Sequence, residues 1–117
     1  VVCFENCTGV KAALQMVDAD APDIVRAIAA RYLDIGCAVM TPDTNRMALL
    51  RQLTEDYAVD GIVEVNLQAC TPYSVESWQV RQLSESLGRP YLRLETDYSD
   101  GDGGQLATRL EAFFEIL

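Results

Sequence analysis

Cysteine carries most of the chemical potential of this sequence, because histidine is absent. The 117 residues include four cysteines and no histidine. Without histidine, the chain lacks the usual zinc ligand and the general base of Ser–His and Cys–His nucleophile pairs. Three of the cysteines, at positions 7, 37 and 70, fall on segments that the sequence predicts to be loops. Thiolates on such loops could together hold a soft metal or an iron–sulfur cluster.

Each cysteine also has a purely structural interpretation. Free cysteine is among the most buried residue types and often acts as a small apolar side chain. Cys3 lies inside an apolar run, so we expect it to pack in the core. For Cys7, Cys37 and Cys70, a structural role and a ligand role both stay open. Disulfides are a third option, but widely spaced cysteines in an acidic chain without a visible secretion signal favour a reducing compartment, the cytoplasm.

The types of donor favour an iron–sulfur cluster over zinc. Zinc would need a fourth ligand from Asp, Glu or Cys3, and the sequence contains no Cys-x-x-Cys pair. An all-thiolate set suits an iron–sulfur cluster, and three thiolates would leave one iron open to water or to a substrate oxygen. The candidate ligands are therefore Cys7, Cys37 and Cys70.

Charged side chains are weaker candidates. Asp97, Asp100 and Asp102 form an acidic loop, but their spacing is not that of an EF-hand calcium loop. Capping of the last helix is the expected role of this loop. The helix arginines, Arg46 among them, are expected to be solvated charges on helix faces.

The overall composition excludes several classes of partner. Eighteen acidic residues against nine basic ones give a net charge of −9, which repels a phosphate backbone, so we expect no nucleic acid partner. The longest apolar runs, such as residues 62–65, are far shorter than the ~20 residues of a membrane span, so no membrane partner is expected. The length and the 50% hydrophobic content predict one folded domain over residues 1–117.

The elements that must position the cysteines alternate between strands and helices. Residues 1–5 are apolar and β-branched, which predicts a buried strand that ends near Cys7. Apolar residues at helical spacing predict helices over residues 22–36 and 41–57, the second with a threonine N-cap. The short apolar run at residues 37–40 could be a strand or a buried connection, and periodicity does not decide between them.

Further along the chain, residues 62–67 form a mostly apolar run. Such a run is typical of a strand that is covered on both faces, and this one ends just before Cys70. Ser74 is the expected N-cap of the helix that follows. The apolar residues of that helix include Val75 and Trp78, which we expect to face the core.

The last two elements are a strand at residues 91–95 and an amphipathic helix that runs to the end of the chain. Asp102 with Gln105 three residues later resembles a capping box for this helix. Strands that alternate with helices predict an α/β fold with right-handed crossovers. We expect three layers: a mostly parallel sheet of three to four strands with helices on both faces.

This fold would bring the loop cysteines together. Ligands of open α/β sheets bind at the carboxyl ends of the strands. Cys7 and Cys70 each follow a predicted strand, so we expect them on the same rim of the sheet, with Cys3 away from it.

Several motifs occur in a fixed order along nearly the whole chain: Glu5-Asn6-Cys7-Thr8-Gly9, Arg31-Tyr32 followed by Cys37, Asp60-Gly61-Ile62-Val63 leading to Cys70, and Arg89-Pro90-Tyr91 through Glu95-Thr96-Asp97-Tyr98 to Gln105 and Thr108-Arg109. In this order and spacing they resemble the 2-hydroxyacyl-CoA dehydratase D-component family. That family includes 2-hydroxyglutaryl-CoA dehydratase and is related to benzoyl-CoA reductase subunits. No single motif is decisive, but the joint match is fairly specific.

The resemblance implies a lyase subunit that holds a [4Fe-4S] cluster through three cysteines, which correspond to Cys7, Cys37 and Cys70. Its partners would be an acyl-CoA substrate, a second dehydratase subunit and an ATP-dependent iron–sulfur activator that injects one electron, in anaerobic metabolism. In such enzymes the reduced thioester becomes a ketyl radical anion that expels the 2-hydroxyl group. Two alternatives remain: an electron-transfer or reductase-type [4Fe-4S] subunit of the same wider family, and a non-catalytic α/β interaction domain.

The start of the chain suggests a part of a longer subunit. The sequence begins at Val1, without a methionine and inside an apolar run, and the subunits of the family it resembles have a further α/β domain before this region. We therefore expect residues 1–117 to be the C-terminal, cluster-binding part, which folds on its own core but is inactive alone. A cysteine from the preceding domain could replace Cys37 as a ligand.

Overall fold

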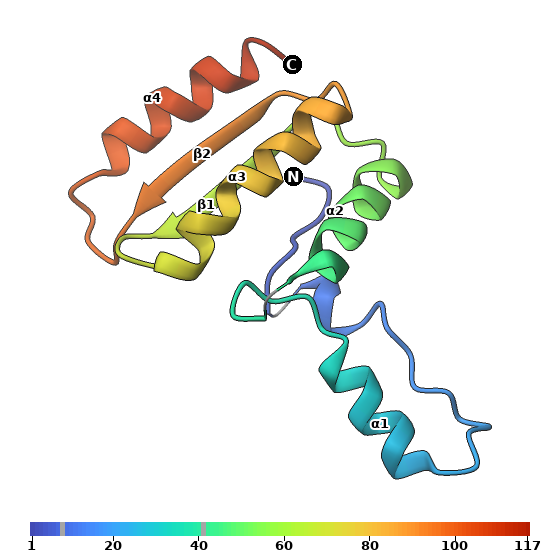
Figure 1. Cartoon of the computed structure of the whole chain (residues 1–117). Coiled ribbons are helices and arrows are strands. Elements are labelled where there is room, and N and C mark those ends of the chain that lie inside the picture. The colour runs from blue at the N-terminus through green and yellow to red at the C-terminus, as the bar shows by residue number, and fades with distance from the viewer. Residues whose placement is uncertain (8, 41) are drawn as a thin grey trace. The chain divides into compact units, whose positions relative to one another are not determined.

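The computed structural model describes residues 1–7, 9–40 and 42–117. Thr8, part of the first motif, and Thr41, the predicted helix N-cap, lie outside the described residues. The described residues form four α-helices, one short 3-10 helix and two β-strands, so the chain is an α/β protein (Figure 1). They divide into two compact units, Val1–Ala58 and Val59–Leu117. The expectation of one domain over the whole chain stays a prediction.

The unit Val1–Ala58 is mainly helical. It contains the 3-10 helix η1 (Val10–Ala12) and the α-helices α1 (Ile24–Leu33) and α2 (Thr44–Asp56). Both predicted helices are thus confirmed. Each is capped by an aspartate, Asp23 or Asp43, whose carboxylate accepts a hydrogen bond from the backbone N–H three residues later.

Residues 1–5 do not form the predicted strand. They are irregular, and Val1, Val2 and Phe4 are 100%, 62% and 63% exposed. A strand is stable only when a neighbouring strand completes its ladder of hydrogen bonds. The described residues of this unit contain no other strand, which explains why an apolar, β-branched run stays irregular.

The two α-helices of this unit differ in burial. Helix α1 has no buried residue, whereas α2 buries Leu50 and Leu53. The connection between the two helices contains a turn, closed by a hydrogen bond of 2.7 Å from the Met40 N–H to the Cys37 carbonyl. Residues 37–40 are therefore a connection and not a strand. Among all the helices in the described part of the chain, none is long and apolar enough to cross a bilayer.

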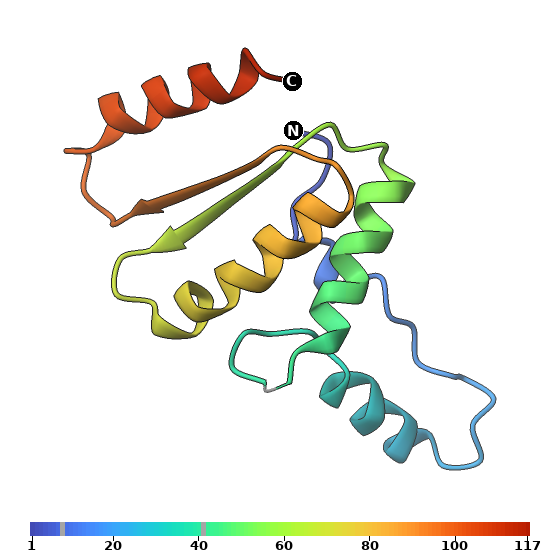
Figure 2. The same ribbon diagram turned by 45° about the horizontal axis from the view of Figure 1, so that its top comes forward.

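The unit Val59–Leu117 is a β–α–β–α unit. Its elements are β1 (Ile62–Leu67), α3 (Thr71–Ser86), β2 (Tyr91–Thr96) and α4 (Gly103–Phe114). The two strands lie side by side in parallel, paired from Ile62↔Tyr91 to Leu67↔Thr96, and α3 connects them (Figure 2). Both predicted strands and both predicted helices of this region are confirmed. The described residues form two strands instead of three to four, and the three-layer arrangement stays a prediction.

Burial alternates along β1, which contradicts the prediction of a strand covered on both faces. Glu64 and Asn66 are buried, whereas Val63, Val65 and Leu67 are 37%, 59% and 42% exposed. Successive side chains of a strand point to opposite faces of the sheet, so the buried face of β1 is the polar one. This face is buried because polar side chains of α3 hydrogen-bond to it.

Helix α3 also buries a different face from the one predicted. Val75 and Trp78 are 70% and 67% exposed, so they do not face the core. The buried residues of the helix are Glu76, Ser77, Val80, Leu83 and Ser84. The buried apolar core of this unit consists of Val80, Leu83, Leu94 and Phe113. The hydrophobic spacing of α3 failed as a guide because serines and a glutamate take most of its buried positions.

Candidate functional site

The carboxyl edge of the β1–β2 pair is the first candidate site. Because the two strands run in parallel, the segments that follow them start at the same edge, where ligands of α/β proteins bind. The segment after β1 leads to Cys70 within three residues, and the segment after β2 leads into α4.

Cys70 is the N-cap residue of α3, a role that the sequence analysis assigned to Ser74. The turn from β1 is tight, since Ala69 adopts a left-handed φ of 63° and the Cys70 N–H donates to the Leu67 carbonyl at 3.1 Å. The Cys70 thiol is free and half-buried. Unpaired N–H groups at a helix N-terminus stabilise nearby negative charge. The position therefore suits a thiolate that binds a cation.

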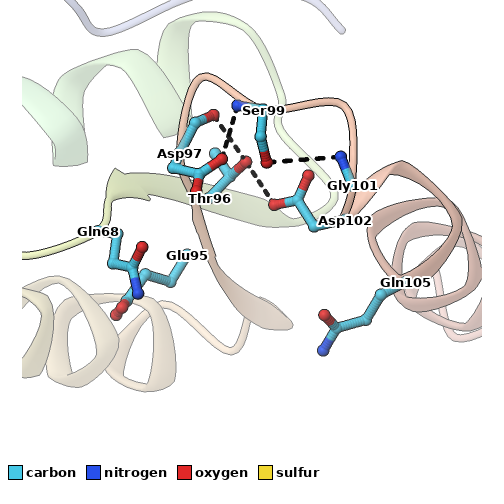
Figure 3. A pocket seen from close by; sticks show the side chains of 8 residues that line it. All are labelled: Gln68, Glu95, Thr96, Asp97, Ser99, Gly101, Asp102 and Gln105. Atoms are coloured by element: carbon cyan, nitrogen blue, oxygen red, sulfur yellow. Dashed lines mark hydrogen bonds between the residues drawn. The ribbon is translucent and has the colours of Figure 1, made fainter.

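A cavity of about 290 Å³ lies at the same edge (Figure 3). Its walls come from the residue after β1, the end of β2 and the loop that leads into α4. The lining is polar, with three carboxylates, two amides and two hydroxyls. The lining residues are Gln68, Glu95, Thr96, Asp97, Ser99, Gly101, Asp102 and Gln105.

Hydrogen bonds order the loop between β2 and α4. The Thr96 hydroxyl donates to Asp102 Oδ2 at 2.6 Å, and the Ser99 N–H donates to Asp97 Oδ1 at 2.6 Å. The hydrogen bonds from Ser99 lower the pKa of the Asp97 carboxyl, which stays ionised at neutral pH. Asp102 is the N-cap of α4, as predicted, but its carboxylate makes no cap hydrogen bond. The predicted capping box with Gln105 is wrong, because Thr96 takes the Asp102 carboxylate instead.

The charge of the cavity limits what it can bind. The carboxylates of Glu95, Asp97 and Asp102 accept hydrogen bonds when they are ionised and have none to donate. They repel phosphate groups for the same reason. The cavity therefore suits a hydroxyl or a cationic group, and the phosphates of a CoA ester would bind elsewhere.

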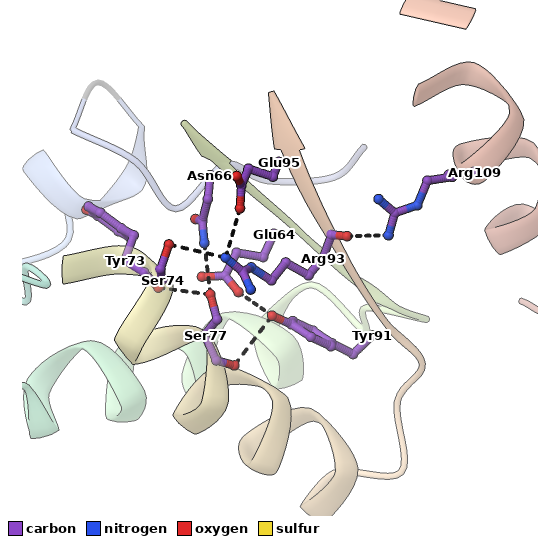
Figure 4. A network of polar contacts seen from close by, with 9 residues as sticks. All are labelled: Glu64, Asn66, Tyr73, Ser74, Ser77, Tyr91, Arg93, Glu95 and Arg109. Carbon is purple, nitrogen blue, oxygen red and sulfur yellow. Dashed lines mark hydrogen bonds and ion pairs between the residues drawn. The ribbon is translucent and has the colours of Figure 1, made fainter. Parts of the chain in front are cut away.

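Sequence reasoning missed a polar network between the sheet and α3 (Figure 4). The Asn66 amide donates to the Ser77 hydroxyl at 2.8 Å, and this hydroxyl donates to the Tyr73 carbonyl at 2.8 Å. The Tyr91 hydroxyl donates to Glu64 Oε2. Burial, followed by the hydrogen bond and the charge of Glu64, raises the pKa of Tyr91, so the phenol stays neutral.

Arg93 extends this network toward the carboxyl edge. Its Nη2 donates to the Ser74 hydroxyl at 3.2 Å and pairs with Glu95 Oε2 at 3.3 Å. Its backbone carbonyl accepts a hydrogen bond of 2.7 Å from Arg109. One signal in the sequence could have revealed the network: polar residues occupy every second position within residues 62–67.

The other two candidate ligands belong to the unit Val1–Ala58. Cys7 is exposed in a turn, and Cys37 is half-buried in the loop between α1 and α2. Neither residue follows a strand, so the argument that placed Cys7 at a strand end is wrong. Cys3 is half-buried, and burial raises the pKa of its thiol. This environment is that of a packed cysteine.

A buried ion triad lies close to Cys7 in the sequence. Glu5 Oε1 pairs with Lys11 Nζ at 2.6 Å, and Glu5 Oε2 pairs with Arg46 Nη2 at 3.1 Å. The three side chains are 8%, 4% and 5% exposed. The prediction that Arg46 is a solvated charge is therefore wrong. Its partner Glu5 is 41 residues away in the sequence, a separation that a helical pattern does not reveal.

The candidate ligands are distributed over both units. Within each unit, the described residues contain no group of three or more cysteine, aspartate or glutamate side chains that could hold a metal ion. Cys7 and Cys37 lie in one unit and Cys70 in the other. Their convergence on one site, including a common rim for Cys7 and Cys70, stays a prediction.

Comparison with known proteins gives matches to a family and to individual relatives. Residues 1–117 match the family described as 2-hydroxyglutaryl-CoA dehydratase, D-component. The chain is 48% identical over 118 residues to a protein named "Putative dehydratase subunit YjiM" from Escherichia coli (strain K12), which covers 100% of the chain and 30% of that protein. It is 24% identical over 87 residues to a benzoyl-CoA reductase subunit of Thauera aromatica, which covers 71% of the chain and 20% of that protein. The chain thus spans less than a third of the length of these relatives.

Proposed function

Because the chain belongs to the 2-hydroxyglutaryl-CoA dehydratase D-component family, we propose that it is the cluster-binding part of a subunit that eliminates water from a 2-hydroxyacyl-CoA. The full-length protein would be a lyase that acts with a partner subunit and an ATP-dependent iron–sulfur activator. The observation that carries this proposal is Cys70, a free thiol at a helix N-terminus on the carboxyl edge of the β1–β2 pair.

The donor set of the chain fits a [4Fe-4S] cluster. Cys7, Cys37 and Cys70 are free, and none of them is fully buried. Thiolates are the ligands that such clusters require, and a set of three leaves one iron without a protein ligand. These three residues would hold the cluster. Four free cysteines are also typical of a reducing compartment, so we place the protein in the cytoplasm.

When bound, the cluster supplies an iron open to a substrate oxygen and access to the single electron that turns the thioester into a ketyl radical anion, from which the 2-hydroxyl group leaves. The residues of the chain shape the surroundings of the reaction. Glu95, Asp97 and Asp102 exclude the CoA phosphates from their part of the carboxyl edge and accept hydrogen bonds from hydroxyl groups.

A reductase-type or electron-transfer subunit is the second candidate, and the match to the benzoyl-CoA reductase of Thauera aromatica favours it. Such a subunit would use the same three thiolates. Incubation of the full-length subunit with its partner, its activator and a 2-hydroxyacyl-CoA separates the two candidates. An enoyl-CoA product supports the dehydratase, and electron transfer without loss of water supports the reductase type.

The ligand assignment is tested by anaerobic reconstitution of the full-length subunit with iron and sulfide. Replacing Cys7, Cys37 or Cys70 by serine should sharply lower the bound iron and sulfide, because an oxygen ligand holds a soft cluster poorly. Cys3→Ser is the matched control and should retain both. Iron that survives all three substitutions and falls in Cys3→Ser would reverse the assignment. A chain that binds no iron in any form would be a non-catalytic interaction domain.

A further inference from the structure

We propose that Arg46 is a positioning residue that holds the Cys7 loop and the Cys37 loop at a fixed separation. The inference rests on the proposed function, because Cys7 and Cys37 are two of the proposed thiolate ligands. It is carried by contacts inside the unit Val1–Ala58. The side chain of Arg46 holds the first loop, and its backbone holds the second.

The side chain of Arg46 is tied to the Cys7 loop through Glu5. Arg46 Nε and Nη2 lie 3.2 and 3.1 Å from Glu5 Oε2, and Lys11 Nζ lies 2.6 Å from Glu5 Oε1. Glu5 precedes Cys7 and Lys11 follows it, so one carboxylate joins both flanks of the loop to α2. The pairing is buried, with the three side chains at 8% exposure or less, so water screens it little.

The Cys7 loop is also closed at its base. The Val10 N–H donates to the Phe4 carbonyl at 3.2 Å, and the Gly9 N–H donates to the Asn6 carbonyl at 3.2 Å. A Cβ on Gly9 would lie 2.2 Å from the Phe4 carbonyl oxygen, so only glycine allows this approach. Because the base is closed and the flanks are paired, the position of Cys7 depends on where α2 holds Glu5.

The backbone of Arg46 contacts the Cys37 loop through Gly36. A Cβ on Gly36 would lie 2.6 Å from Arg46 N and 2.7 Å from Arg46 Cα, so the two backbones meet with no room for a side chain. Asn45 adds a hydrogen bond of 3.3 Å from Nδ2 to the Asp34 carbonyl. The start of α2 thus fixes the segment that directly precedes Cys37.

One residue in the first turn of α2 therefore serves both loops. Asp43 Oδ1 accepts the Arg46 N–H at 3.3 Å, which fixes this turn in place. Thiolates that are held in position before a metal binds lose less conformational freedom on binding. Removing groups that orient ligands typically lowers metal affinity by about 10-fold or more. Arg46 acts in this way on two ligands at once.

The first test measures the separation of the two thiols directly. The cluster-free, full-length subunit is treated with bis-maleimide cross-linkers of graded spacer length, and the Cys7–Cys37 cross-linked peptide is quantified by mass spectrometry. One spacer length should dominate in the unchanged protein. Arg46→Met should spread the yield over several lengths, and Arg46→Lys, which keeps the charge, should partly restore the narrow profile. Arg51→Met, at an exposed position of the same helix, is the matched control and should leave the profile unchanged.

The second test measures the bound iron and sulfide after anaerobic reconstitution. Arg46→Met should lower the affinity for the cluster by about 10-fold, and Arg46→Lys should recover part of it. If Arg46→Met does not fold, as judged by circular dichroism, Gly36→Ala tests the backbone contact and Glu5→Gln the side-chain contact by the same measurements.

Two outcomes separate this proposal from the proposed function. A cross-linking profile that stays narrow in folded Arg46→Met, or in both replacement variants, overturns the role of Arg46. Iron that stays bound after Cys7→Ser and Cys37→Ser overturns their role as ligands instead. The cross-linking profile then still decides whether Arg46 holds the two loops.

Discussion

Each unit of the protein buries one glutamate, and the two carboxylates are stabilised in different ways. In the unit Val1–Ala58, Glu5 lies between the two cations Lys11 and Arg46. In the unit Val59–Leu117, Glu64 is 7% exposed and accepts a hydrogen bond from the Tyr91 hydroxyl. Its other oxygen, Oε1, has no hydrogen-bond partner within the described part of the chain.

The difference shows that a buried carboxylate can be compensated by charge or by a hydroxyl, with different consequences. Two buried cations need the negative charge of Glu5, so removing that charge exposes the cost of burying them. A phenol needs only an acceptor, which a neutral amide also offers. The first unit should therefore respond to the loss of charge, and the second to the loss of a hydrogen bond.

The largest effect is expected from Glu5→Gln. This change keeps the size of the side chain but removes its charge, and breaking a buried ion pair costs about 3 kcal/mol of unfolding free energy. Urea unfolding of the chain at neutral pH measures the loss. Glu55→Gln, at an exposed position of α2, is the control and should change stability by less than ~0.5 kcal/mol. Equal effects of the two substitutions would show that the ion triad contributes nothing.

A smaller loss is expected from Tyr91→Phe. The substitution removes the only side-chain hydroxyl that the structure gives to Glu64 among the described residues, and an unmade hydrogen bond at a buried carboxylate costs about 1.5 kcal/mol. Tyr98→Phe, at a 93% exposed tyrosine, should leave the unfolding free energy unchanged. A Tyr91→Phe variant as stable as the unchanged chain would mean that this hydrogen bond does not compensate Glu64.

The same residue sharpens the comparison at alkaline pH. The pKa of Tyr91 is raised in the folded chain, so above about pH 10, the usual tyrosine pKa, the unfolded chain loses this proton first. The stability from Tyr91 is thus present below about pH 10 and is lost as the pH rises toward the folded-state pKa. Urea unfolding over a pH series should show a shallower alkaline decline for Tyr91→Phe. Parallel declines for both chains would contradict the raised pKa.

Glu64→Gln should change stability by less than ~1 kcal/mol, in either direction. The amide oxygen of glutamine still accepts the Tyr91 hydroxyl, while the cost of burying a charge disappears. The same urea experiment measures this change beside Glu5→Gln. If Glu64→Gln proved as destabilising as Glu5→Gln, the proposed difference between the two units would fail.

The smallest effect concerns the Arg81–Glu85 pair on α3, a surface counterpart to both buried glutamates. Its side chains are 64% and 52% exposed, and solvated pairs at this spacing contribute about 0.3 kcal/mol. Arg81→Ala should lower the unfolding free energy by about that amount in dilute buffer and not at all in about 1 M salt. A loss above ~1 kcal/mol that survives high salt would show that Arg81 has a packing role.

Local patterns in the sequence determined most of the secondary structure and one of the site residues. The apolar runs at residues 62–67 and 91–95 are the observed strands, because the spacing and branching of side chains act within a single segment. The position of Cys70 just after a strand followed from the same local signal, and the structure places it at the carboxyl edge.

Only the tertiary structure decided which surfaces and charges are buried. Residues 1–5 have the composition of a strand, but a strand also needs a neighbour to pair with, and composition does not supply one. Val75 and Trp78 were expected in the core and are exposed, since the face that α3 buries depends on the polar strand beneath it.

Arg46 shows the physical reason most clearly. Its type and its place on a helix predict a solvated charge, and both statements are local. The burial of Arg46 depends on Glu5, which the fold brings within 3.1 Å from 41 residues away. Local spacing therefore determined where the chain forms helices and strands, whereas contacts between distant segments decided which of its charges leave water and which residues can hold the candidate ligands in place.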